Sequence, residues 1–199
     1  LADESAGRLT IVDQVITVNP AATISVDTAN LLDATTTGTV TATITSSSVD
    51  TLKTLTGTNA YTITIAAADA TGSTASELTT ISNATTVAID ASAVTGLASD
   101  TAANIKTLLT AGNDTAQFTG ASFGSLATAV VSDTTLSGSD LAGAIDQANT
   151  ATGGTGTVFT ISAVNTITGS EADFTDLLTD EGKNQICLLY TSPSPRDKT

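Results

Sequence analysis

The side chains best suited to chemistry in this sequence are four carboxylates near its C-terminal end. Asp173, Asp176, Asp180 and Glu181 follow one another at spacings of three, four and one residues. Spacings of three and four place the aspartates on one face of a helix, and carboxylate oxygens are typical ligands of Ca²⁺. These residues are the predicted metal ligands, with calcium as the metal. The alternative is a solvated acidic face near a helix start, where negative charge is favourable.

A glycine-rich segment, residues 153–158, is the second motif related to calcium. Its sequence, GGTGTV, is similar to the GGxGxD nonapeptide that binds calcium in repeat proteins. Val158 stands where that motif requires an aspartate, and no second copy adjoins the segment. The segment therefore predicts a turn, and no cofactor other than calcium is expected.

The composition excludes most catalytic chemistry. The 199 residues include no His and one Cys, so histidine-dependent nucleophilic catalysis and zinc sites built from His or Cys cannot form within the chain. Paired-carboxylate catalysis needs only Asp and Glu, but it usually acts on sugars that aromatic side chains hold. The aromatic residues mostly lie in segments expected to be buried: Tyr61, Phe118, Phe123, Phe159 and Phe174. We expect no enzymatic activity.

Charge and hydropathy restrict the partners. The chain has 20 acidic and 6 basic residues, for a net charge of −14, and its basic residues are scattered. Such a chain repels phosphate backbones, so we expect no binding to nucleic acid. Its apolar runs are only four or five residues long, so we expect no membrane span.

A degenerate repeat organises the chain. Residues 31–44, 52–65 and 78–91 align without gaps: each begins with Leu and reaches an alternating segment nine residues later. The first part of a unit has helical spacing, as at Leu78 and Ile81, and follows capping residues. Thr74 and Glu77 fit a capping box, and residues 170–173 fit one more weakly. The second part alternates with a period of two, which is typical of a strand exposed on one face.

Later segments continue this pattern less regularly. Helices are expected over residues 99–109, 122–131 and 139–148, a strand over 158–161, and a final helix whose apolar face holds Phe174, Leu177 and Leu178. Because a connection that contains a helix usually joins parallel strands, we expect an α/β fold: an irregular solenoid of short helix and strand repeats with a parallel sheet. The competing fold is a chain of all-β, adhesin-like sandwich modules.

The sequence divides into three regions by composition. Residues 1–23 are expected to be a partial leading strand region, and residues 24–186 one segment of helix and strand repeats. Residues 187–199 contain the one Cys and two of the three Pro. The run CLLYTSPSPRD within them resembles the translation of a transposase-type sequencing adapter, so this tail is expected to be non-native.

The recurring phrases resemble a known class of repeats. Residues 41–44 (TATI), 59–64 (NAYTIT) and 87–92 (VAIDAS) lie in a chain with 43 Thr and 31 Ala. They are similar to the Thr/Ala-rich tandem repeats of very large surface or secreted proteins of marine bacteria, especially picocyanobacteria. The resemblance implies an extracellular or cell-surface location and a structural or adhesive role. The expected partners are neighbouring repeats of the same chain, together with cell-surface polymers or other cells.

Two other functions are kept as alternatives. One is a calcium-responsive binding module whose acidic loops become ordered on metal binding. The other is a carbohydrate-active β-solenoid. Calcium-dependent melting would favour the first, and sugar binding that is lost on carboxylate substitution would favour the second.

Overall fold

The computed structural model describes residues 12–154, 156–161, 166–179 and 186–188, and they form a mixed α/β structure. The α-helices are α2 (Val26–Asp33), α3 (Val49–Leu52), α4 (Ala75–Asn83), α5 (Ala102–Gly112), α6 (Gly138–Thr152) and α7 (Glu171–Thr179), and a short 3₁₀ helix covers Ala67–Asp69. The strands are β1 (Ile16–Thr17), β2 (Thr23–Ile24), β3 (Val40–Ile44), β4 (Ala60–Thr62), β5 (Gly96–Asp100), β6 (Thr128–Val131), β7 (Thr135–Ser137), β8 (Val158–Ile161), β9 (Thr166–Thr168) and β10 (Ile186–Leu188).

The strands form small parallel sheets, as the alternation of helices and strands predicts. In the first sheet, β3 pairs with β1, β2 and β4. In the second, the strand order is β10, β8, β6, β5. In the third, β7 pairs with β9. Each of these pairings is parallel. The α/β class is thereby confirmed. The all-β alternative is wrong, because side-chain caps start helices between the strands.

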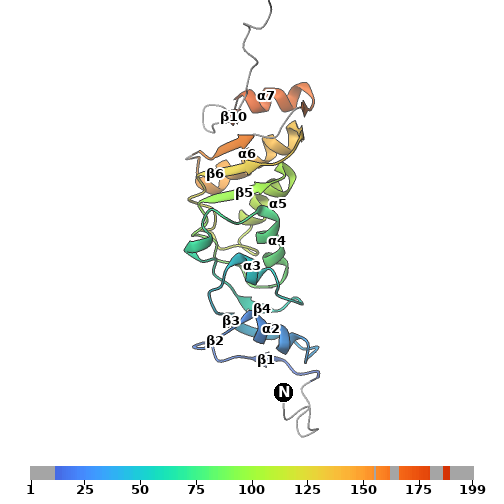
Figure 1. The fold of residues 1–199 in the computed structure, drawn as a ribbon, viewed down its shortest axis with the longest axis vertical. Coiled ribbons are helices and arrows are strands. Elements are labelled where there is room, and N and C mark those ends of the chain that lie inside the picture. Colours follow the sequence, from blue (N-terminus) through green and yellow to red (C-terminus); the bar gives the residue numbers. More distant parts are fainter. Residues whose placement is uncertain (1–11, 155, 162–165, 180–185, 189–199) are drawn as a thin grey trace, which may run out of the picture.

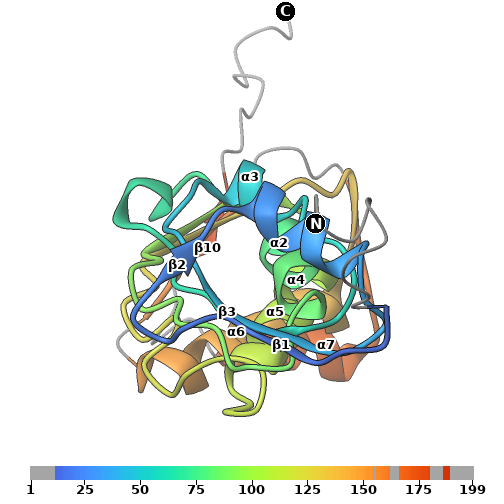
Figure 2. The ribbon, with the colours of Figure 1, turned by 90° about the horizontal axis from the view of Figure 1, so that it is seen from below.

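The elements follow one another in chain order along the long axis of an elongated molecule (Figure 1). Each strand, or pair of strands, and the helix after it form a group that we call a layer. The six layers are β1–β2–α2, β3–α3, β4–α4, β5–α5, β6–β7–α6 and β8–β9–α7. Seen along the axis, the layers lie over one another around a shared centre (Figure 2).

The core lies inside this stack and follows the predicted alternation. In β3, Val40, Ala42 and Ile44 are buried while Thr41 is exposed. Most of the aromatic side chains are core residues, as predicted: Tyr61, Phe118, Phe123 and Phe159 are completely buried. The rings of Phe118 and Phe123 pack with their centroids 5.2 Å apart. Buried Val, Leu, Ile and Ala from all six layers join them in one cluster.

The predicted helix starts are largely confirmed. The Glu77 amide donates to Oγ1 of Thr74 at 3.2 Å, and the Thr74 amide donates to Glu77 Oε2 at 3.0 Å, which completes the capping box of α4. The helix expected over 139–148 is α6, and its apolar face is buried as predicted: Leu141, Ala144, Ile145 and Ala148. The segment at 153–154 is a turn, in which Gly153 ends α6 in the left-handed region at φ 62°.

Three expected elements differ in the structure. The helix expected from Ser99 begins at Ala102, because Ser99 and Asp100 belong to β5 and Thr101 caps the helix. Residues 122–131 are not helical: Phe123 adopts φ 60°, which breaks a helix, and β6 starts at Thr128. In the expected strand 87–91, Ile89 and Ala91 are buried, but the segment contributes only isolated bridges and Val87 is 36% exposed.

The apolar face expected for α7 is only partly buried. Leu177 is buried, whereas Phe174 is 38% and Leu178 67% exposed. Among the described residues, no helix is long and apolar enough to cross a bilayer.

In the expected leading region, β1 falls within 12–23, and residues 1–11 lie outside the described chain. Cys187 and Leu188, from the expected non-native tail, pair with β8 as part of β10; the rest of that tail also lies outside the description.

Candidate functional site

Two of the four predicted calcium ligands, Asp173 and Asp176, lie on α7, where Asp173 already has a structural role. Its Oδ2 accepts hydrogen bonds from the Ser170 amide at 2.7 Å and the Ser170 hydroxyl at 2.9 Å. The Asp173 amide donates in return to the Ser170 hydroxyl at 3.3 Å. This reciprocal pair is the cap predicted for residues 170–173. The two bonds from Ser170 hold the pKa of Asp173 below its ordinary value.

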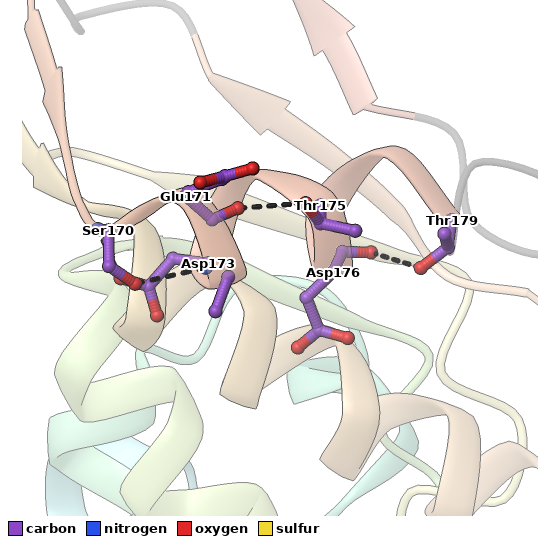
Figure 3. A pocket seen from close by; sticks show the side chains of 7 residues that line it. Ser170, Glu171, Asp173, Thr175, Asp176 and Thr179 are labelled. Carbon is purple, nitrogen blue, oxygen red and sulfur yellow. Dashed lines mark hydrogen bonds between the residues drawn. The ribbon is translucent and has the colours of Figure 1, made fainter.

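The other carboxylates of α7 do not converge with Asp173 on one point. Figure 3 shows Glu171 and Asp176 pointing to opposite sides of the helix. The Thr175 hydroxyl donates to the carbonyl oxygen of Glu171 at 2.8 Å, and the Thr179 hydroxyl donates to that of Asp176 at 3.0 Å. These residues line a shallow hollow along one helix, which is open to solvent.

Only half of the predicted metal site falls within the described chain. Asp173 and Asp176 lie one helical turn apart on α7, whereas Asp180 and Glu181 lie outside the described residues. Within the described part, no three His, Cys, Asp or Glu side chains form a group that could hold a metal ion. A calcium site at these four residues therefore stays a prediction.

A second hollow crosses α4, α5 and α6. Its polar lining includes hydroxyls of Thr79, Thr107 and Thr110, each of which donates to a carbonyl oxygen four residues earlier. Lys106 Nζ lies 3.2 Å from Asp140 Oδ1 at the same place. A threonine hydroxyl that already donates to a carbonyl oxygen can only accept a further hydrogen bond. The positive charge of the lysine compensates the negative charge of the carboxylate with which it is paired. The chemistry of this hollow is therefore that of a solvated surface between helices.

The polar groups with the clearest roles connect one layer to the next. Asp100, at the end of β5, accepts from the amide of Ser76 in α4 at 2.7 Å, and these residues are 24 positions apart. Asp133 accepts from the amide of Ala102 in α5 at 2.8 Å, across 31 positions. In both cases a carboxylate from a later layer satisfies an unpaired amide at the helix start in the preceding layer.

The hydrogen bonds that Asp100 accepts lower its pKa. Burial raises the pKa of Asp100, but hydrogen bonds from the Asn104 side chain and from the amides of Ser76 and Thr101 outweigh this effect and lower it. Its ionised form is therefore favoured by folding.

Buried Asn59 makes a similar connection near the N-terminal end. Its amide nitrogen donates to Asp33 Oδ1 at 2.8 Å, and its amide oxygen accepts from the Val40 amide at 2.8 Å. Asp33 also accepts from the Thr56 hydroxyl at 2.9 Å. The end of α2, the start of β3 and the loop before β4 are thus held together by one amide side chain.

Two buried hydroxyls replace missing strand partners. Thr85 Oγ1 accepts from the amide of Tyr61 at 3.0 Å and donates to its carbonyl oxygen at 2.7 Å. Ser122 Oγ accepts from the amide of Ala91 at 3.0 Å and donates to the carbonyl oxygen of Ile89 at 3.3 Å. Both hydroxyls satisfy backbone groups that would otherwise be buried without partners.

Lys53 joins two layers through charge. Its Nζ lies 2.6 Å from Asp50 Oδ1 in the same layer and 2.7 Å from Glu77 Oε1 in the next. The bonds to Asp50 and Glu77 raise the pKa of Lys53. The bond from Lys53, followed by those from Thr74, lowers the pKa of Glu77. Glu77 therefore acts both in its own helix cap and in the link to the preceding layer.

Sequence reasoning did not find these links between layers. The available signals were an Asp at the end of each of two short segments before a helix, and polar residues recurring one layer apart. Without the layer length, neither signal identifies a partner.

Comparisons with known proteins add no assignment. No protein family, curated protein or solved structure was found to match this chain.

Proposed function

We propose that this chain is a structural segment of a repeat protein, an α/β solenoid that sets length and spacing and carries no catalytic site. The observation that supports this best is the repeated use of polar side chains to bind each layer to the next. A protein whose units are stabilised mainly by their neighbours is suited to forming an extended scaffold.

The bonds between layers occur along most of the described chain. Near one end, Asn30 donates to the carbonyl oxygen of Thr54 at 2.9 Å and accepts from the Thr56 amide at 2.9 Å. Near the other, Asn113 donates to Gln147 Oε1 at 2.8 Å. The first two bonds span 24 and 26 positions and the last spans 34. The bonds near the C-terminal end thus span more positions, while the manner of connection persists.

The composition of the surface agrees with a spacer. In the strands, threonines that face solvent alternate with buried residues, as Thr41 does in β3. The excess of acidic residues gives the chain a net charge of −14. Like charge along an elongated body opposes collapse and aggregation. We propose an extracellular or cell-surface location on the resemblance of the repeats, with neighbouring repeats as the principal partners.

The experiment that tests the proposal is small-angle X-ray scattering on the full chain, combined with chemical denaturation. We expect the distance distribution of a rod-like particle and a cooperative unfolding transition. The distribution of a sphere of the same mass would reject the extended scaffold. A distribution typical of an unfolded chain, without a transition, would reject the stable stack.

A further inference from the structure

The strands lie across the long axis of the molecule, so the hydrogen bonds that join them run along it (Figure 1). Each strand pairing between the six layers joins adjacent layers, as β3 pairs with β4 and β6 with β8. In a parallel sheet the backbone hydrogen bonds point from one strand to the next. Tension along the long axis therefore acts in the direction of these bonds.

The direction of tension decides whether such bonds break together or in turn. Two strands that are pulled along their length share the load over all the bonds between them. Two strands that are pulled apart sideways place the load on the nearest bonds, which break one after another. The described chain enters the stack at one end and leaves it at the other, so tension between its ends separates the layers sideways.

A layer that separates leaves the rest of the stack intact, because most bonds between layers reach only the next layer. The Ala98 amide in β5 donates to the carbonyl oxygen of Ser73 at 2.9 Å, just before α4. The Tyr61 hydroxyl reaches further, to the carbonyl oxygen of Ala29 two layers away, at 3.4 Å. The chain has one Cys, so no disulfide within it can fasten the layers together. The loss of one layer therefore requires the loss of one junction.

The junctions differ in the apolar surface that they bury. α3 is four residues long and buries Val49 and Leu52. α5 and α6 are 11 and 15 residues long and pack against each other. Their apolar side chains, such as Leu108, Leu141 and Ile145, are completely buried. Because burial of apolar surface is the main stabilising contribution, the contact between α5 and α6 is the strongest junction.

We propose that the chain is an extensible tether: under tension between its ends it lengthens by releasing one layer at a time, and the junction of α5 with α6 breaks last. The inference rests on the proposed stacked scaffold and adds that the scaffold stretches. The start of one layer lies between 20 residues (Val40 to Ala60) and 36 residues (Ala60 to Gly96) before the start of the next. At about 3.5 Å per residue, each release adds about 70–125 Å of chain. When the tension falls, the released layer folds again on the exposed surface of its neighbour.

The test is a force measurement with optical tweezers on the full chain, held by DNA handles at its two ends. We expect several steps, each of about 70–125 Å in contour length, which are recovered when the force is lowered. Release of the whole stack in a single step of more than about 400 Å would overturn the proposal. That result would leave the rod-like scaffold standing. A chain that lengthens smoothly, without any step, would contradict the scaffold as well, so the two failures are distinguishable.

A crosslink between two layers identifies one step. Thr43 and Thr62 are register partners on β3 and β4, and Thr62 is exposed. Neighbouring strands lie about 4.8 Å apart, which a disulfide can span. We expect Thr43→Cys with Thr62→Cys, in a Cys187→Ser background, to remove the shortest step when oxidised, since tension then bypasses the chain between positions 43 and 62. The reduced chain is the matched control. An oxidised chain that keeps every step would overturn release by layers.

Two mild substitutions test the order of release. Ile145→Val removes one methyl group from the buried face of α6 and is expected to lower the force of the last step. Val49→Ala, in α3, is the matched change in a weaker junction, and it should lower the force of the shortest step without changing the last. A last step that responds to Val49→Ala and not to Ile145→Val would overturn the order. Circular dichroism checks that both variants are folded.

Discussion

The hydroxyl of Thr85 binds both backbone polar groups of Tyr61, accepting from its amide at 3.0 Å and donating to its carbonyl oxygen at 2.7 Å. The two residues are 24 positions apart: Tyr61 lies in β4, and Thr85 lies in the segment between α4 and β5. One side chain therefore does what a strand partner does elsewhere in the stack. The same hydroxyl accepts from the Val87 amide at 3.1 Å, which shapes the turn that leaves Val87 exposed.

Replacing Thr85 by valine should destabilise the chain strongly. The substitution keeps the shape but leaves the buried amide and carbonyl of Tyr61 without partners, so we expect the free energy of unfolding to fall by about 2–4 kcal/mol. Urea denaturation measures the change. The matched control is Thr80→Val, whose hydroxyl binds an exposed carbonyl on α4, and it should change stability by less than about 0.5 kcal/mol. Equal effects of both variants would contradict the role given to Thr85.

Gly112→Ala should destabilise although alanine is the better helix former. In an exposed helix, this change stabilises by about 1 kcal/mol. Here a Cβ at position 112 would lie 2.5 Å and 2.7 Å from two atoms of the buried Phe123 ring, so we expect a net loss of about 1–3 kcal/mol. Gly120→Ala, with open space around its position, is the control. A stabilised Gly112→Ala variant, measured by thermal denaturation, would show that the ring moves freely.

The stack should lose stability in acid. The pKa values of Asp100 and Glu77 are lowered on folding, so protons bind the unfolded chain more readily. The stability that these two ionised carboxylates contribute is fully present above the ordinary carboxyl pKa of about 4. It is lost as the pH falls below that value toward the lowered pKa values of the folded chain. Urea midpoints measured from neutral pH down to about 3 should be level and then decline.

Asp100→Asn isolates one part of this acid effect. The variant loses an acceptor for the Ser76 amide or for the Thr101 amide, and we expect it to lower stability at neutral pH by about 1–3 kcal/mol. The stability of the variant should fall less steeply in acid than that of the wild type, because one titrating group is gone. Asp27→Asn, an exposed residue in the first turn of α2, is the control. An unchanged acid decline in Asp100→Asn would contradict the proton linkage.

Calcium should have little effect on stability if the chain is a passive scaffold. We expect melting temperatures in chelator and in millimolar calcium to agree within about 1 °C, because a ligand stabilises only the state that it binds. A clear rise in the melting temperature would favour the calcium-responsive module instead. Asp173→Asn and Asp176→Asn would then show whether the ions bind at α7.

The sequence predicts those elements whose periodicity is strong. β3 alternates Val, Ala and Ile with Thr, and α6 repeats Leu, Ala and Ile at helical spacing, so both are found where expected. β5 and β6 were missed because their Ala, Ser and Thr residues give little contrast between the two faces. The left-handed backbone of Phe123 is fixed by the packing of its ring against α5 and has no local signal.

The candidate site was predictable only as far as local geometry determines it. The cap between Ser170 and Asp173 follows from a three-residue spacing. The partners of Asp100, Asp133 and Asn59 lie 19 to 31 positions away. These distances depend on loop lengths that differ from layer to layer, so no fixed sequence spacing identifies the partners.

The side-chain hydrogen bonds that join different layers connect residues 19 to 34 positions apart. Most of them reach one layer along the chain, and the bond from the Tyr61 hydroxyl in β4 to the carbonyl oxygen of Ala29 in α2 reaches two. A polypeptide organised in this way can fold as it leaves the ribosome, since each newly synthesised layer finds its binding surface already formed. Duplication or loss of a whole layer in the gene would likewise leave the other junctions in register, so the length of the molecule can change while each remaining junction keeps its contacts.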